Sequence, residues 1–84
     1  IGSATTGGNW STDFDMTWDN TLLKWTYTGT FLAGEFKFRL NHDWSQTNWG
    51  GSGGQASTSG GNIAVSAGTH TILLDPYDLT YSIN

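Results

Sequence analysis

The chain has 84 residues, which is room for one domain with a single core. Three Lys or Arg stand against seven Asp or Glu, a net charge of −4, and so few cations exclude an electrostatic nucleic-acid binder. Cysteine is absent, which excludes disulfides and thiolate metal sites. No apolar run approaches the roughly 18 residues of a membrane-spanning helix. Twelve aromatic residues supply a core and the polar residues are mostly Thr and Gly, so the composition predicts an all-β domain.

Strict alternation of apolar and polar residues predicts four half-buried strands, and no ten-residue stretch keeps a helical period. The strands span residues 22–28, 35–40, 69–75 and 79–83. Shorter strands are expected at residues 62–66, at residues 1–4 along a sheet edge, and around residues 14–18. We expect the core between two sheets to contain Trp25, Tyr27, Phe36, Phe38, Ile72, Leu74, Tyr81 and Ile83.

Turn residues separate these strands. Asp75-Pro76-Tyr77-Asp78 places Pro where its fixed φ suits a type I turn, which predicts an antiparallel hairpin between the last two strands. Phe31-Leu32-Ala33-Gly34 predicts a second hairpin. Residues 48–62 contain six Gly and no strand pattern, so a long flexible loop is expected there. Because the chain starts at Ile1 without Met or a signal peptide, we expect a piece of a longer protein, with any export signal or lipid anchor outside it.

Residues for catalysis are few. The six Asp fall in predicted turns or at strand ends, where Asp accepts hydrogen bonds from backbone amides. No Ser stands in a G-x-S-x-G elbow and no Lys follows the Gly pairs as in a phosphate-binding loop. His42 and His70 lack the spacing of metal ligands, and we expect the first to be solvated and the second to be packed. The sequence therefore predicts no enzyme, no cofactor and no metal site. Sugar hydrolysis in particular would need two carboxylates that face each other across a cleft.

The five Trp are the stronger signal. Trp25 shares a face with apolar neighbours and is expected in the core, whereas Trp18 is ambiguous. Trp10, Trp44 and Trp49 lie in segments rich in Gly, Asn, Ser and Thr, where burial under a loop and exposure as a sugar platform both remain open. An indole can stack on the apolar face of a pyranose, whose hydroxyls then need donors and acceptors. The candidate ligand-binding residues are Trp10, Lys37, Arg39, Trp44, Asn48 and Trp49, with the two cations pointing away from Phe36 and Phe38.

Short motifs follow one another along nearly the whole chain. They are Ile1-Gly2-Ser3-Ala4-Thr5, Gly8-Asn9-Trp10, Ala33-Gly34-Glu35-Phe36-Lys37-Phe38-Arg39, Asp43-Trp44-Ser45, Asn48-Trp49-Gly50-Gly51, Gly61-Asn62-Ile63, Ala67-Gly68-Thr69-His70-Thr71-Ile72 and Leu79-Thr80-Tyr81-Ser82-Ile83. In this order and spacing they resemble one domain of the SusE/SusF family, the surface starch-binding lipoproteins of Bacteroidetes outer membranes.

The resemblance implies an immunoglobulin-like antiparallel β-sandwich without catalytic activity that holds α-glucan at the cell surface. It implies tandem neighbouring domains on one lipid-anchored outer-membrane protein. It also implies that Trp10 is the first aromatic of the site, that Trp44 or Trp49 is the second, and that Lys37 or Arg39 is the basic residue. The alternative is a structural spacer or assembly domain without a sugar site, and self-association of the chain stays open. The two functions differ in whether two of the three Trp are exposed and coplanar on one surface.

Overall fold

The structure is a computed structural model that describes residues 1–6, 10 and 12–84. Gly8 and Asn9, which belong to one of the motifs above, lie outside the described residues. The strands are β1 (Thr17–Asp19), β2 (Lys24–Phe31), β3 (Gly34–Phe36), β4 (Phe38–Arg39), β5 (Asn48–Ser52), β6 (Gln55–Ser57), β7 (Ile63–Val65), β8 (Gly68–Asp75) and β9 (Thr80–Ile83). Within these residues, no helix is long and apolar enough to cross a membrane.

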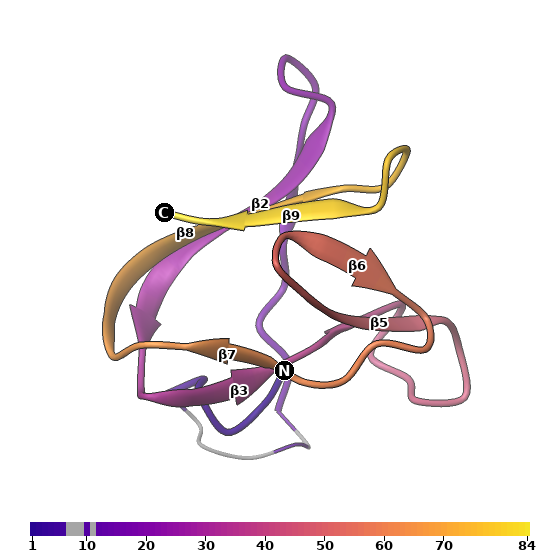
Figure 1. Cartoon of the computed structure of the whole chain (residues 1–84). Coiled ribbons are helices and arrows are strands. Elements are labelled where there is room, and N and C mark those ends of the chain that lie inside the picture. The colour runs from indigo at the N-terminus through magenta and orange to yellow at the C-terminus, as the bar shows by residue number, and fades with distance from the viewer. Residues whose placement is uncertain (7–9, 11) are drawn as a thin grey trace.

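The described strands are all paired antiparallel, in one large sheet and one small one. The large sheet has the order β1-β2-β8-β9-β6-β5-β4, and the small sheet pairs β3 with β7. The large sheet curls, so that β5 and β6 lie below β8 and β9, next to β3 and β7 (Figure 1). Such curling brings apolar faces of the same sheet opposite each other. The predicted fold class, an all-β antiparallel sandwich, is confirmed.

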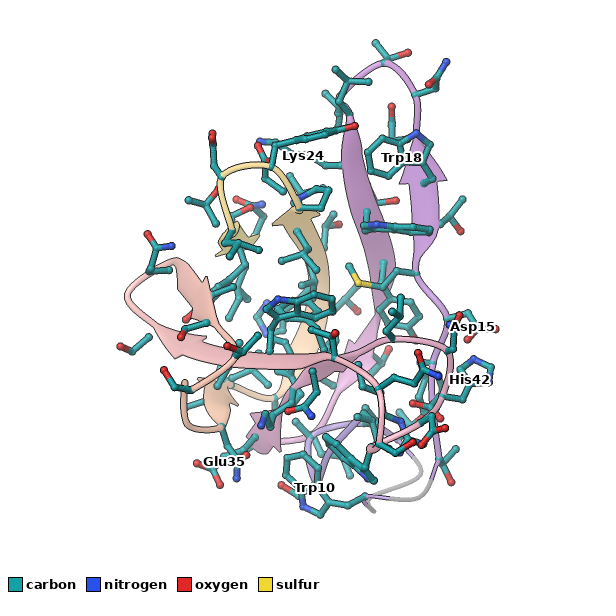
Figure 2. All side chains as sticks on the ribbon, turned by 90° about the vertical axis from the view of Figure 1, so that its right-hand side faces the viewer. Trp10, Asp15, Trp18, Lys24, Glu35 and His42 are labelled. Carbon is teal, nitrogen blue, oxygen red and sulfur yellow. The ribbon has the colours of Figure 1, made fainter. Side chains whose placement is uncertain are left out.

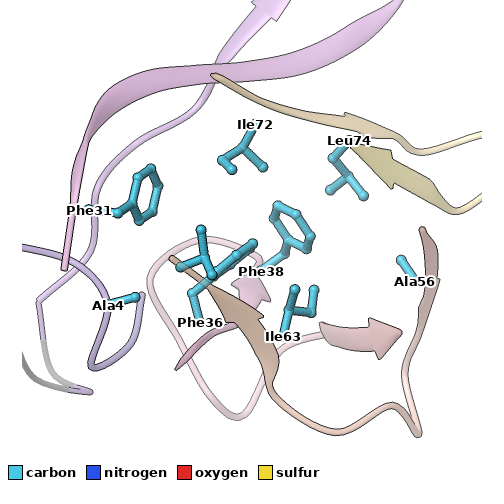
Figure 3. Close-up of a cluster of buried hydrophobic side chains, with 9 residues drawn as sticks. Ala4, Phe31, Phe36, Phe38, Ala56, Ile63, Ile72 and Leu74 are labelled. Atoms are coloured by element: carbon cyan, nitrogen blue, oxygen red, sulfur yellow. The ribbon is translucent and has the colours of Figure 1, made fainter. Parts of the chain in front are cut away.

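The hydrophobic core lies between the two layers. Ile72 and Leu74 of β8 face Phe36 and Phe38 across the interior (Figure 3), and these four side chains are buried as the alternation predicts. The rest of the core cluster is made of Ala4, Phe31, Ala56, Ile63 and Val65. Tyr27, Tyr81 and Ile83 are partly buried against this cluster.

The predicted hairpin between the last two strands is confirmed. β8 and β9 pair antiparallel from Ile72↔Ile83 to Asp75↔Thr80. The Asp75 Oδ1 atom accepts hydrogen bonds from the amides of Tyr77 at 2.8 Å and Asp78 at 3.1 Å. The turn is therefore stabilised by the local side-chain to backbone bonding that makes Asp a turn residue.

The predicted hairpin at residues 31–34 is wrong. β8 occupies one edge of β2, and β1 covers the other edge only at residues 24–26, so β3 does not pair with the edge that stays open near Phe31. Just beyond β2, the Leu32 amide donates to the Ala4 carbonyl of the N-terminal segment at 2.7 Å. The chain instead crosses to the small sheet, where β3 pairs with β7. The predicted strand 35–40 is also divided, because β3 belongs to the small sheet and β4 to the large one.

The first five residues lie beside residues 35–37, where the chain passes from β3 to β4. The Lys37 amide donates to the Ile1 carbonyl at 2.9 Å, and the Ala4 amide donates to the Glu35 carbonyl at 3.0 Å. Only Gly2 forms a strand bridge, so the expected edge strand at residues 1–4 is reduced to a single bridge.

The glycine-rich segment 48–62 is not the long loop expected from the sequence. It forms the β5–β6 hairpin, with the register Gly50↔Ser57 to Ser52↔Gln55. Gly53 and Gly54 make the turn with φ of 60° and 85°, and two positive φ values are what a two-residue type I′ hairpin requires. Strands made largely of Gly pair through their backbones but show no alternation of apolar and polar residues. The sequence pattern therefore did not predict this hairpin.

Trp25 is the other correction. It was expected in the core but is 39% exposed. The β1–β2 hairpin rises above the rest of the molecule (Figure 1), so no second layer covers its end. Trp25 packs there edge-on against Trp18, with ring centroids 5.4 Å apart. The strand expected around residues 14–18 is β1, which begins only at Thr17.

Candidate functional site

Five of the six candidate ligand-binding residues come together beside the paired strands β4 and β5. Lys37 and Arg39 alternate with the buried Phe36 and Phe38, so their side chains leave on the opposite face, as predicted. The β4–β5 register sets Arg39 opposite Asn48. The Lys37 ammonium donates to the Asn48 Oδ1 atom at 2.8 Å.

Trp10 and Trp44 meet next to these polar side chains, and we call them the indole pair. Their ring centroids are 6.2 Å apart and the ring planes are inclined by 43°. The Trp44 indole N–H donates to the Trp10 carbonyl at 3.4 Å. Trp44 is 40% exposed and Trp10 is partly buried at the base of the molecule in Figure 2. The two rings are therefore together and accessible, but they are inclined by 43°, so the coplanar pair that was to distinguish a glycan-binding module from a spacer is not found.

The turn that carries Trp44 is held locally. Asn41 and His42 adopt left-handed backbone conformations with φ of 55° and 58°. The Asp43 carboxylate accepts hydrogen bonds from both the amide and the hydroxyl of Ser45, each at 2.8 Å. These two bonds, first the one from the backbone amide, lower the pKa of Asp43. They fix the chain on either side of Trp44.

Arg39 lies behind Trp44 and not at the surface. Its Nε donates to Asp13 Oδ1 at 2.8 Å and its Nη2 donates to Oδ2, a bidentate pair whose side chains are only 8% and 15% exposed. This hydrogen bonding lowers the pKa of Asp13 and raises the pKa of Arg39. The guanidinium carbon lies 4.8 Å from the centroid of Trp44, within the range of a cation–π contact. Arg39 therefore supports the Trp44 ring, and its donors are directed to Asp13.

Lys37 occupies the outer position. Its Nζ lies 5.8 Å from the centroid of the Trp44 ring. An ammonium has three N–H donors, and within the described residues Asn48 takes one of them. The Lys37–Asn48 pair thus presents donors and an amide close to the indole pair.

Trp49, the sixth candidate, is placed elsewhere. It is the register partner of Phe38, and directly opposed residues of an antiparallel pair share one face of the sheet. Its side chain accordingly packs against the core cluster. Its neighbour Asn48 points the other way, toward Lys37. The core position of Trp49 could have been predicted if Trp49 had been recognised as the cross-strand partner of Phe38. No strand was expected at Trp49, so this register was not predicted.

Two residues near the site were missed. Asp13 and Asp15 were expected to cap turns, as Asp19 and Asp75 do. Asp13 instead binds Arg39, and Asp15 pairs with His42. Asp15 and His42 lie next to each other in Figure 2, and their side chains are 73% and 61% exposed. Both partners are more than 25 residues away along the chain, so no local sequence signal identifies either pair.

Residues for metal binding do not gather in the described part of the chain, where no group of three or more His, Cys, Asp or Glu could hold an ion. Comparisons of the chain with protein-family models, with curated proteins and with solved structures gave no match.

Proposed function

We propose that this domain is a non-catalytic carbohydrate-binding module that holds α-glucan on the indole pair. The observation that carries the proposal is the meeting of Trp10 and Trp44, with centroids 6.2 Å apart, beside the hydrogen-bonded Lys37 and Asn48. Together with the resemblance to SusE/SusF domains, it favours a domain of a longer protein at the outer-membrane surface. Carbohydrate sites need both elements, because a pyranose has an apolar face and a rim of hydroxyls.

The inclination of the rings favours a curved glucan. Two coplanar indoles would match a flat β-linked chain, whose sugar faces lie in one plane. An α-linked glucan coils, so its successive sugar faces are inclined to one another. The 43° between Trp10 and Trp44 suits this second shape. We therefore expect maltooligosaccharides to bind and cellooligosaccharides of the same length to bind much more weakly.

The polar side chains suit a neutral ligand. Lys37 and Asn48 offer donors and an acceptor to sugar hydroxyls, as polar groups in ligand sites usually do. Arg39 keeps its bonds to Asp13 and acts by holding Trp44 in place. Because the ligand carries no charge, its affinity should hardly change with salt concentration.

The Asp13 carboxylate is poorly suited to act as a catalytic acid. Glycoside hydrolysis needs a carboxylic acid whose pKa is raised, so that it can protonate the leaving oxygen. The Arg39 guanidinium lowers the pKa of Asp13, which keeps this carboxyl ionised. This supports a binding role over a hydrolytic one.

The test is isothermal titration of maltoheptaose into the wild type and the Trp44→Ala and Trp25→Ala variants. Trp25 is a matched control, because it is 39% exposed against 40% for Trp44 but lies at the far hairpin. Aromatic stacking is worth about 1–3 kcal/mol per ring, taken from base stacking, so Trp44→Ala should weaken binding about 5- to 150-fold. Trp25→Ala should bind like the wild type, and thermal melts should show that each variant is folded.

Two results would contradict the proposal at different levels. A folded wild type that gives no heat and is not retained on starch would refute glycan binding and favour the spacer or assembly domain. Binding by the wild type that is unchanged in Trp44→Ala would keep the module but refute the indole pair as its site.

A further inference from the structure

A cavity of about 410 Å³ reaches from the core to the surface, where the exposed Trp25 and Leu40 line it. Its walls come from both layers, with Phe38, Ile72 and Leu74 on the core side and Met16, Trp49 and Leu79 around them. The last three wall residues pack against the core yet stay only partly buried. The inner wall of the cavity is therefore made of apolar side chains.

The size of this space matches small-molecule sites. Pockets that hold drug-sized ligands usually measure about 300–1,000 Å³ and are lined by apolar and aromatic side chains. Apolar cavities take up apolar molecules because the bound ligand restores dispersion contacts that the empty space forfeits. A ligand in this cavity would cover more of Met16, Trp49 and Leu79, which are only partly buried.

The polar and apolar side chains around the cavity indicate which ligand it accepts. Asp13, Asp15, Arg39 and His42 border it, and they are paired as Asp13–Arg39 and Asp15–His42. Lys37, which also borders it, donates to Asn48. Among the described residues, no buried side-chain nitrogen or oxygen lacks a hydrogen-bond partner. Lys37 keeps further donors at this border, but the inner wall of Phe38, Ile72 and Leu74 is apolar and no buried polar atom of the described residues is unpaired, so a charged ligand against that wall would lose its hydration without compensation.

We propose that this cavity is a second ligand site, which binds one neutral, apolar small molecule per chain. It lies beside the indole pair: Lys37 and Arg39, which contact the Trp44 ring, border it, whereas neither Trp10 nor Trp44 lines it. The proposal stands on the cavity alone and does not depend on glycan binding.

The probe is N-phenylnaphthylamine, a neutral fluorophore that brightens in apolar surroundings. Trp25 and Trp49 line the cavity, so excitation of Trp should also be transferred to the bound probe. We expect a saturable signal with one probe per chain, and a higher melting temperature with the probe, since ligands of the native state stabilise it. The anionic relative anilinonaphthalene sulfonate should give a much weaker signal, and excess maltoheptaose should leave the probe signal unchanged.

A pair of variants locates the binding. Met16→Trp places an extra indole where Met16 lines the cavity and should lower the affinity for the probe roughly tenfold or more. Leu22→Trp adds the same group at the tip of the β1–β2 hairpin, where Leu22 is 51% exposed, and should leave the affinity unchanged. If Met16→Trp does not fold, two measurements on the wild type still test the proposal: the rise in melting temperature with the probe, and stronger binding of the neutral probe than of the anionic one.

Three results would overturn the proposal. One is the absence of a saturable signal with the folded wild type, and another is equal binding of the neutral and anionic probes, which would indicate general surface adsorption. The third is an equal loss of affinity in both tryptophan variants.

Discussion

Gly50 of β5 offers the sharpest test of how the glycine-rich half of the chain is packed. A Cβ atom at this position would stand 2.0 Å from the carbonyl oxygen of Gly61 and 2.5 Å from that of Gly60. The neighbouring Gly51 amide donates to the same Gly61 carbonyl at 2.9 Å. Both obstacles are backbone atoms, which cannot move aside as a flexible side chain would. Gly50→Ala should therefore push β5 away from the segment that leads into β7.

The expected cost follows from these contacts. Overpacking in a closely fitted region costs about 1–3 kcal/mol, and loss of the hydrogen bond to Gly61 adds about 1 kcal/mol. Together they reduce the free energy of unfolding by about 2–4 kcal/mol. A domain of this size has about 4–13 kcal/mol in total, and its melting temperature should fall by about 10–30 °C. Tryptophan fluorescence during reversible thermal or urea unfolding measures both quantities.

Gly61→Ala is the matched control, eleven residues further along the same segment. A Cβ there meets no heavy atom within 4 Å, and the φ of Gly61 is not positive. The substitution restricts the unfolded chain and should stabilise the protein by about 0.4–1 kcal/mol. If Gly50→Ala melts within a couple of degrees of the wild type, or if the two variants lose stability equally, the close approach of β5 to residues 60–61 is refuted.

Two further predictions concern the core and the ion pair. Phe36 is 4% exposed, so Phe36→Ala should cost about 3–5 kcal/mol in urea unfolding, and a midpoint close to the wild-type value would show that β3 does not face the core. The Arg39 guanidinium lowers the pKa of Asp13 below its ordinary 3.8, so this pair stabilises the native state above pH 3.8 and loses that effect as the pH falls through the lowered pKa. Asp13→Asn should cost about 2 kcal/mol at neutral pH, and its urea midpoint should approach that of the wild type in strong acid; a constant difference at every pH would contradict the pair.

The candidate site was partly predictable from local pattern. Alternation with the buried Phe36 and Phe38 places Lys37 and Arg39 on the outer face, because successive side chains of a strand point in opposite directions. It does not show that Asp13 takes up Arg39 and leaves Lys37 as the outer cation. That partner is 26 residues away, and only the folding of the intervening chain brings the two charges together.

The sequence by itself determined the all-β class, the four core residues Phe36, Phe38, Ile72 and Leu74, and the turn at residues 75–78, because these depend on alternation and on Asp–Pro turn chemistry between neighbours. The tertiary structure decided which strands pair, and with it the crossing at residues 31–34 and the division of residues 35–40 between two sheets. It also decided the fate of each indole. Trp25 is left uncovered where a hairpin extends past the second layer, and Trp49 turns to the core because Phe38 is its cross-strand partner. Burial of a strand residue depends on whether another layer covers its face of the sheet. Alternation of apolar and polar residues shows which side chains share a face, but not whether that face is covered.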